Sequence, residues 1–220
     1  MSFRSSVRST AQEVTIGGKR LAGRLVVPDG ARGLVLFAHG SGSSRLSPRN
    51  AHVAEALNDR GLATLLFDLL TEAEARDRAN VFDIPLLGER VMETVFWTQD
   101  EPATRDLPLG LFGASTGAAA ALVAAAAVPE TVAAVVSRGG RPDLAASYLA
   151  RVRAPTLLIV GGDDDMVIGL NEQAYARLTC EKALVVVPGA SHLFEEPGTL
   201  DEVIRQAGDW FARHLLGEGS

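Results

Sequence analysis

The stretch Leu-Gly-Leu-Phe-Gly-Ala-Ser-Thr-Gly at positions 109–117 decides how the rest of the chain is interpreted. It begins as a short apolar strand, passes through a G-x-S-x-G turn and runs at once into an alanine-rich segment that favours a helix. A strand–turn–helix of this form holds Ser115 above the end of the strand in a strained conformation. Glycine is required at 113 and 117, because larger side chains two residues either side of Ser115 would collide in so sharp a turn.

Apolar runs of strand length alternate with helical patterns on both sides of this turn. Regular alternation of this kind predicts an α/β fold with a mostly parallel sheet, here of about eight strands, and helices on both faces. The first two strands are expected to form an antiparallel hairpin. Strands are predicted at 14–16, 21–27, 34–38, 62–67, 109–112, 132–136, 156–160 and 183–187. Helices are predicted at 48–60, 88–99, 116–128, 143–151, 168–178 and 200–216, and a polar, irregular, solvated loop at 69–87.

The length and composition fit one domain over residues 1–220, since 47% of the residues are hydrophobic and can supply a large core. Loose ends are expected at 1–10 and 217–220. No long insertion separates two strands, so we expect no large cap and a fairly open site.

Charge and cysteine content narrow the partners and the compartment. The formal net charge of −6 and the pI of about 5.3 argue against nucleic acid and anionic membrane as main partners. No run of 18 apolar residues predicts a transmembrane helix, and the start of the chain lacks the apolar core of a signal peptide. The single cysteine, Cys180, excludes an intrachain disulfide and favours a reducing, cytoplasmic compartment. We expect a monomer or a homodimer.

A serine hydroxyl needs a base within hydrogen-bond reach to act as a nucleophile, and the chain has four histidines to supply it. In the elbow arrangement the acid and the histidine follow the serine, which leaves His192 and His214. His192 lies in a loop directly after the last predicted strand, at the carboxyl end of the sheet where sites form. His214 lies in the last predicted helix, at a turn expected to be exposed. The pattern therefore predicts His192 as the general base for Ser115.

The acid that orients this histidine is expected after the 156–160 strand, where the sequence reads Gly-Gly-Asp-Asp-Asp-Met-Val at 161–167. Three adjacent carboxylates repel one another, so one should be buried against the histidine while the others stay solvated or cap a helix. Spacing alone leaves Asp163, Asp164 and Asp165 open.

Backbone N–H groups for an oxyanion hole are expected from two places. One is Thr116, which follows the nucleophile at a helix N-terminus. The other is the glycine- and serine-rich loop after the 34–38 strand, with Ser41 as the preferred donor and Gly42 next. His39, which opens that loop, is expected to orient it rather than to take part in the chemistry.

These motifs, together with Gly-Ala-Ser-His at 189–192, resemble those of the α/β-hydrolase superfamily, most of all its small dienelactone-hydrolase-type members. The likeness runs from about residue 14 to 216. In that family the acid usually stands three residues after a glycine and three before a valine, which selects Asp164. The 37–45 loop also resembles a bacterial subgroup of hydrolases that are sometimes fused to phosphoribosyltransferase domains. No such domain is expected here.

The resemblance and the residue chemistry together imply a serine hydrolase. It would cleave a small carboxylic ester, thioester or lactone through Ser115, His192 and Asp164 and an acyl-enzyme, without a metal or an organic cofactor. Dienelactone hydrolases use cysteine as nucleophile, so ester hydrolysis in general carries over and the lactone substrate does not. Two alternatives stay open: a non-hydrolytic ligand-binding protein of the same fold, and an acyltransferase that uses the same acyl-enzyme.

Several residues in strand-end loops are candidates for substrate binding. Guanidinium groups bind carboxylate and phosphate well, so Arg45, Arg138 and Arg141 are candidates for anion recognition, with solvated surface charge as the alternative. Met166 and Phe194, with Leu193, are candidates for an acyl pocket, with core packing as the alternative.

Overall fold

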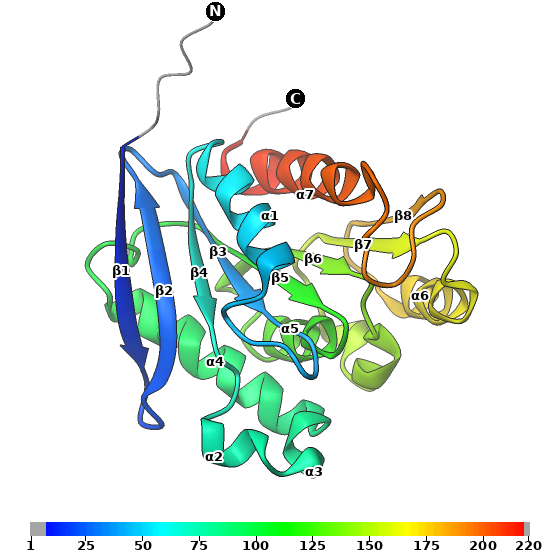
Figure 1. The fold of residues 1–220 in the computed structure, drawn as a ribbon, viewed down its shortest axis with the longest axis horizontal. Coiled ribbons are helices and arrows are strands. Elements are labelled where there is room, and N and C mark those ends of the chain that lie inside the picture. The colour runs from blue at the N-terminus through cyan, green and yellow to red at the C-terminus, as the bar shows by residue number, and fades with distance from the viewer. Residues whose placement is uncertain (1–7, 218–220) are drawn as a thin grey trace, which may run out of the picture.

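The computed structural model describes residues 8–217, which form one eight-stranded sheet in the order β1-β2-β4-β3-β5-β6-β7-β8 (Figure 1). The β1–β2 and β2–β4 pairs are antiparallel, and the remaining pairs are parallel. This confirms the mostly parallel sheet with an antiparallel opening hairpin. The strands are β1 Ser9–Ile16, β2 Leu21–Pro28, β3 Gly33–Ala38, β4 Leu62–Phe67, β5 Leu109–Ala114, β6 Val132–Arg138, β7 Thr156–Gly161 and β8 Lys182–Val187.

Helices cover both faces of the sheet. Figure 1 shows α1 and α7 on one face and α4, α5 and α6 on the other. Among residues 8–217, no helix combines the length and apolar character that crossing a bilayer requires. The helices are α1 Pro48–Asn58, α2 Glu72–Ala75, α3 Arg78–Val81, α4 Ile84–Asp100, α5 Thr116–Ala127, α6 Asp165–Arg177 and α7 Thr199–Leu215, with 3-10 turns η1 Pro142–Ala145 and η2 Leu149–Arg151.

Two hydrophobic cores lie on the two faces, and the alternation of side chains along each central strand fills both. On β3, Leu34 and Leu36 point into the core beneath α4 and α5, whereas Val35 and Phe37 point into the core beneath α1 and α7. Successive side chains of a strand face opposite sides of the sheet. A strand covered on both faces therefore needs an unbroken apolar sequence, which is what the 34–38 run provides.

Helix α5 lies against the centre of the sheet, and its residues from 116 to 126 are all buried. Small side chains allow this close approach. The neighbouring helix α4 also comes close, because a Cβ at Gly88 would lie 2.6 Å from Val123 Cγ1. The alanine-rich sequence after the turn thus places the start of α5, and with it Ser115, in the middle of the molecule.

The segment expected as an irregular loop at 69–87 is instead largely helical, and this prediction was wrong. Thr71 and Glu74 form a reciprocal capping box that starts α2. Helix α4 begins at Ile84 rather than at 88, with the Asp83 side chain accepting a hydrogen bond from the Leu86 N–H. Ile84 is buried in the core beneath α4 and α5, so the end of this segment is not solvated.

Other boundaries differ by smaller amounts. Strand β1 begins at Ser9, so the loose end expected at 1–10 is wrong for residues 9 and 10, whereas 1–7 and 218–220 lie outside the described residues. Helix α6 begins at Asp165 rather than at 168. The helix expected at 143–151 is two separate 3-10 turns, η1 and η2.

Enlarging a buried alanine of α5 should destabilise the fold, because the helix has no space against the sheet. We expect Ala124→Leu to lower the free energy of unfolding by about 1–3 kcal/mol in urea denaturation. Ala127→Leu is the matched control on the same helix, where the side chain is exposed and the change should be within about 0.5 kcal/mol. Equal effects of the two substitutions would contradict the packing described for α5.

Candidate active site

Ser115 lies in a strained turn between β5 and α5, with φ 51° and ψ −121°. Backbone in this region costs on the order of 1–3 kcal/mol for a residue other than glycine. A Cβ at Gly113 would overlap the Cα of Ala118, and a Cβ at Gly117 would overlap the carbonyl oxygens at the end of β3. Glycine at both positions is therefore what allows the chain to turn with the Ser115 side chain at its tip.

The imidazole of His192 contacts a single carboxylate. Its Nδ1 lies 2.7 Å from Asp164 Oδ2, and the Asp164 side chain is 17% exposed. Asp163 and Asp165 are exposed. Asp164 occupies the N-cap position of α6 but makes no side-chain capping bond. Of the three consecutive carboxylates, the one that meets the histidine is the one that the family spacing selects.

Backbone contacts hold the acid loop and the histidine loop together. The Gly162 N–H donates to Val187 O at 2.8 Å, and the Asp163 N–H donates to Ala190 O at 3.0 Å. A Cβ at Gly161 would overlap that same Ala190 oxygen. The two loops follow adjacent parallel strands, β7 and β8, so the 2.7 Å contact between Asp164 and the histidine is built on a rigid frame.

Ser115 and His192 line the same cavity of about 330 Å³. The end of β6 brings them together, since the Ser115 N–H donates to Arg138 O at 3.3 Å. Gly139, the next residue, has φ 52°, and a Cβ there would lie 2.9 Å from His192 O and 3.7 Å from its Cε1. Glycine at 139 therefore lets the histidine loop approach Ser115 across the end of β6.

The loop after β3 passes directly beside Ser115. A Cβ at Gly40 would lie 3.0 Å from Ser115 Cβ. The loop turns through a hydrogen bond of 3.1 Å from the Ser43 N–H to Gly40 O, with Gly42 at φ 72° in the position of such a turn that favours glycine. The glycines of this loop thus serve both its turn and its close approach to Ser115.

The N–H groups predicted to form the oxyanion hole differ in whether they already make a hydrogen bond. Thr116 is the first residue of α5, so its N–H has no partner within the helix. The Ser41 N–H donates to Thr116 Oγ1 at 2.9 Å. Ser41 can serve an oxyanion only by sharing or releasing this hydrogen bond, a constraint that the sequence did not indicate.

His39 links the same loop to the end of β4. Its Nδ1 lies 3.0 Å from Gly40 O, and its Nε2 accepts the Leu69 N–H at 3.1 Å. Only the neutral ring with its proton on Nδ1 satisfies both contacts. Burial lowers the pKa of His39 below its ordinary value of 6.5, which favours this neutral form. The side chain holds the loop in place, in agreement with the orienting role expected from the sequence.

The three arginine candidates for substrate binding differ in their ion pairs and in whether they line the cavity that holds Ser115. Arg45 donates from its backbone and from Nη1 to Asp68, at 2.7 and 2.6 Å, and Arg141 donates twice to Asp143, at 2.9 and 2.8 Å. Neither arginine lines the cavity that holds Ser115, whereas Arg138 does.

The two acyl-pocket candidates lie elsewhere than expected. Met166 is 76% exposed and lines no described cavity beside Ser115. Phe194 is 2% exposed and belongs to the core beneath α1 and α7, so core packing, the alternative considered from the sequence, describes it. Leu193 lines the cavity with Ser115. The expectation that His214 is exposed was wrong. Its side chain is 11% exposed and packs against Trp210, with ring centroids 4.6 Å apart.

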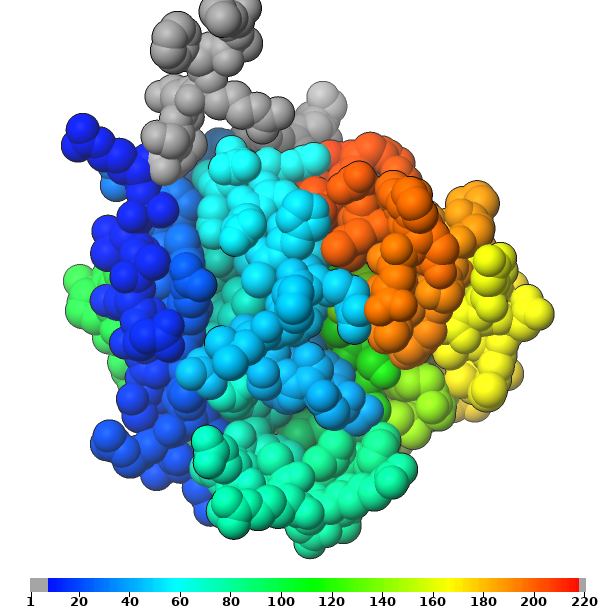
Figure 2. Space-filling model, in the orientation of Figure 1, coloured from blue at the N-terminus to red at the C-terminus, as the bar shows by residue number. Residues whose placement is uncertain are grey.

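A second, larger cavity of about 560 Å³ lies on the other side of the loop after β3. It shares the 40–43 segment with the smaller cavity, so the two meet along this loop. Figure 2 shows residues 41–47, in light blue, crossing this face between the α2–α3 segment and the orange segment that precedes α7. The leucine and valine side chains that line the larger cavity are those of Leu21, Leu46, Leu69, Leu70, Val81 and Leu87.

Two residues of α1 that the sequence reasoning missed also line the smaller cavity, Arg49 and Asn50. Asn50 is 2% exposed and accepts a hydrogen bond from Arg138 Nη2 at 3.0 Å. A signal was present, because position 50 continues the buried stripe of Val53, Ala54 and Leu57 at helical spacing. A polar residue on such a stripe indicates a buried polar partner.

Comparison with known proteins gives a consistent result. Residues 31–213 match the model of a family described as an alpha/beta hydrolase domain. The solved structure of a dienelactone hydrolase from Anabaena variabilis is 56% identical with a TM-score of 0.90, and the match covers 95% of this chain and 99% of that one. Est1E from Butyrivibrio proteoclasticus shares the fold, with a TM-score of 0.79 at 15% identity over 94% of this chain and 99% of that one.

A Mycobacterium tuberculosis protein provisionally named a phosphoribosyl transferase is 58% identical over 213 residues. The match covers 97% of this chain and 48% of that protein, so the chain spans about half the length of this relative.

Removing His39 should change how stability depends on pH. The folded protein keeps His39 neutral below pH 6.5 while the unfolded chain takes up a proton, so the contribution of His39 is present above pH 6.5 and lost as the pH falls. We expect His39→Ala to lose about 1–3 kcal/mol of unfolding free energy at about pH 7.5. Between about pH 7.5 and about pH 5.5, the wild type should then lose more stability than the variant in urea denaturation.

The control for this experiment is His52→Ala, at a histidine whose side chain is 56% exposed. This variant should follow the wild type at both pH values. Parallel pH dependence of the His39→Ala variant and the wild type would show that His39 does not hold the loop in its neutral form.

Proposed function

Because this chain belongs to the alpha/beta hydrolase domain family, we propose that it is a serine esterase in which Ser115, His192 and Asp164 act in turn on a small carboxylic ester, thioester or lactone. The observation that carries the proposal is the 2.7 Å contact between His192 Nδ1 and Asp164, on a ring that lines one cavity with the strained Ser115. A carboxylate fixed on one ring nitrogen leaves the other free to take a proton from a nearby hydroxyl.

The chemistry follows from these positions. With the Nδ1 proton directed at Asp164, Nε2 of His192 is the basic atom and removes the proton of Ser115 as its Oγ attacks the ester carbonyl. Asp164 stabilises the imidazolium that forms. The carbon–oxygen bond to the alcohol then breaks, and His192 gives its proton to the departing alkoxide. Water, deprotonated by the same nitrogen, attacks the acyl-enzyme, and the acid is released as Ser115 recovers its proton.

The negative oxygen of the tetrahedral intermediate needs donors beside Ser115. The N–H of Thr116 meets this need at the N-terminus of α5, where the helix dipole adds positive potential. The Ser41 N–H joins it by exchanging Thr116 Oγ1 for the oxyanion. A single donor of this kind typically lowers the barrier by about 3–4 kcal/mol.

The two cavities on either side of the 40–43 loop can hold the acyl group and the alcohol group of the ester separately. The larger one accepts an apolar group, because leucine and valine side chains supply much of its lining. The rim formed by α2 and α3 consists of two four-residue helices rather than a cap domain, and this supports a preference for short acyl or alcohol groups. The name of the Mycobacterium tuberculosis relative does not bear on this site, because the chain matches only about half of that protein.

Substituting each of the three consecutive aspartates in turn tests the role given to Asp164, because its two neighbours serve as controls. We expect Asp164→Asn and Ser115→Ala to reduce kcat for p-nitrophenyl acetate by about 10³–10⁴-fold, because the base loses its orientation in one and the nucleophile is removed in the other. Asp163→Asn and Asp165→Asn change exposed carboxylates and should stay within about threefold of the wild type.

All variants should unfold at the same urea concentration as the wild type to within about 0.5 M, so that kinetics report chemistry and not folding. Undiminished turnover by Ser115→Ala would overturn the proposed function, and equal losses at all three aspartates would overturn the role given to Asp164.

A further inference from the structure

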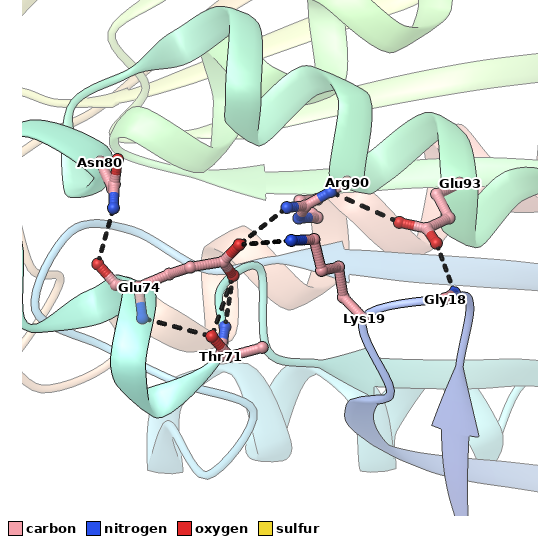
Figure 3. A network of polar contacts seen from close by, with 7 residues as sticks. All are labelled: Gly18, Lys19, Thr71, Glu74, Asn80, Arg90 and Glu93. Atoms are coloured by element: carbon pink, nitrogen blue, oxygen red, sulfur yellow. Dashed lines mark hydrogen bonds and ion pairs between the residues drawn. The ribbon is translucent and has the colours of Figure 1, made fainter.

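Two arginines are buried within residues 8–217, and they differ in the charges that surround them. Arg90, 9% exposed, lies 2.9 Å from Glu74 and 3.6 Å from Glu93 (Figure 3). Arg138, 5% exposed, has no carboxylate within ion-pair distance among the described residues. In both arginines the Nε atom is buried without a hydrogen bond, so this atom does not distinguish them. The difference is that, within the described part of the chain, Arg90 has carboxylates beside it and Arg138 does not. Among residues 8–217, one buried guanidinium is thus neutralised by carboxylates and the other is not.

The contacts of Arg138 fix its position without cancelling its charge. Nη2 donates to Asn50 Oδ1 at 3.0 Å, and the guanidinium lies 5.9 Å from the centre of the Phe194 ring. Burial, with a smaller effect of the nearby Arg49 charge, lowers the pKa of Arg138 to about 10. The side chain is therefore still a cation at neutral pH.

This cation lies at the reaction centre. Arg138 is the last residue of β6, its Cα is the register partner of Ala114 in β5, and its carbonyl accepts the N–H of Ser115. Its side chain lines the cavity of about 330 Å³ together with Ser115 and His192. A ligand group held by Arg138 would thus lie within the cavity that contains the nucleophile.

A second guanidinium strengthens the positive potential of this cavity. Arg49 also lines it and is paired with Glu195 at 2.8 Å, in a bridge whose two side chains are 35% and 60% exposed. The Glu195 carboxylate is exposed and pairs with Arg49, so it does not neutralise the charge of Arg138. A buried charge without a partner is costly, and a structure that maintains one beside a cavity is suited to a ligand that brings the opposite charge.

Resting on the proposed function, we propose that Arg138 recognises an anionic group of the substrate, so that the preferred ester carries a carboxylate or a phosphate in the Ser115 cavity. The planar guanidinium suits either anion, since both accept paired N–H donors. Arg45 and Arg141 do not compete for this role, because each guanidinium is paired with an aspartate, Asp68 or Asp143, and neither lines the cavity that holds Ser115.

Three esters that share the p-nitrophenyl leaving group test the proposal: the succinate half-ester with a free carboxylate, its methyl-capped neutral analogue, and the 3-phosphonopropanoate ester. We expect wild-type kcat/KM to be about 10–100-fold higher for at least one charged ester than for the neutral one, as for a charge-assisted contact. Which charged ester is preferred distinguishes carboxylate from phosphate. A wild type that prefers the neutral ester, or treats all three alike, would overturn the proposal without any variant.

Arginine variants then assign the preference to a residue. Arg138→Met should reduce the preference to about threefold or less, and Arg138→Lys, which keeps the charge without the planar fork, should retain part of it. Arg153→Met is the matched control for loss of one positive charge, because its side chain is 71% exposed and paired with Glu130. An unchanged preference in folded Arg138→Met or, if that variant does not fold, in Arg138→Lys would overturn the assignment.

A binding measurement separates failure of this inference from failure of the proposed function. Titration of Ser115→Ala with succinate and with inorganic phosphate should show saturable binding of at least one anion, weakened about tenfold or more by adding Arg138→Met. Binding in a protein that hydrolyses no ester would leave the anion site standing while the esterase proposal fails. Absence of binding by both anions, with ester hydrolysis intact, would overturn the anion site alone.

Discussion

The site depends on one constraint, the positive φ of Ser115 between a central strand and a central helix. Packing on both sides maintains this strain, because α5 is buried along nearly its whole length and a Cβ at Gly113 or Gly117 would overlap neighbouring backbone. The carboxyl ends of parallel strands meet at the same edge of a sheet. Placing Ser115 there brings it beside the loops that follow β3, β7 and β8, which carry Ser41, Asp164 and His192, and beside Arg138 at the end of β6.

Close backbone approach at this edge is as important as the reactive side chains. Gly40 lets the loop after β3 pass beside Ser115, Gly139 lets the histidine loop cross the end of β6, and Gly161 seats the acid loop against the histidine loop. Each is a position where a Cβ would meet backbone or the nucleophile. His39 adds a neutral hydrogen-bonding bridge from the first of these loops to Leu69, two residues after β4. The geometry of the site is thus set mainly by backbone and by one uncharged ring.

The sequence alone was sufficient where local pattern controls structure. Unbroken apolar runs such as 34–38 predicted strands buried on both faces, and the G-x-S-x-G turn placed Ser115 correctly, because both signals depend on neighbouring residues. The prediction of an irregular loop at 69–87 was wrong, because the structure of this segment depends partly on tertiary packing. Its charged composition resembles a loop, and the burial of Ile84 at the start of α4 depends on how the segment packs. The T-x-x-E pattern of the capping box at Thr71 and Glu74 was by contrast a local signal, which the prediction did not use. Asp164 needed family spacing, since three adjacent carboxylates look alike until one meets His192.

The arginines show the limit of sequence reasoning most clearly. Arg45, Arg138 and Arg141 all stand at or after the end of a strand. Asp143 lies only two residues from Arg141, but nothing local separates Arg45 from Arg138. In the fold, two of them meet aspartates and the third meets an asparagine and a phenylalanine beside the nucleophile. The partners of Arg45 and Arg138 are 23 and 88 residues away in the sequence, so the arginine that gives the cavity its charge becomes evident only in three dimensions.

The central claim is that Ser115 is an activated nucleophile. It is tested most directly by the intact mass of the protein after brief exposure to a fluorophosphonate, followed by peptide mapping of the adduct. The account predicts one phosphonyl group per chain, carried by Ser115, and no adduct when position 115 is alanine. An adduct on a different serine, or a folded protein that stays unlabelled, would contradict it.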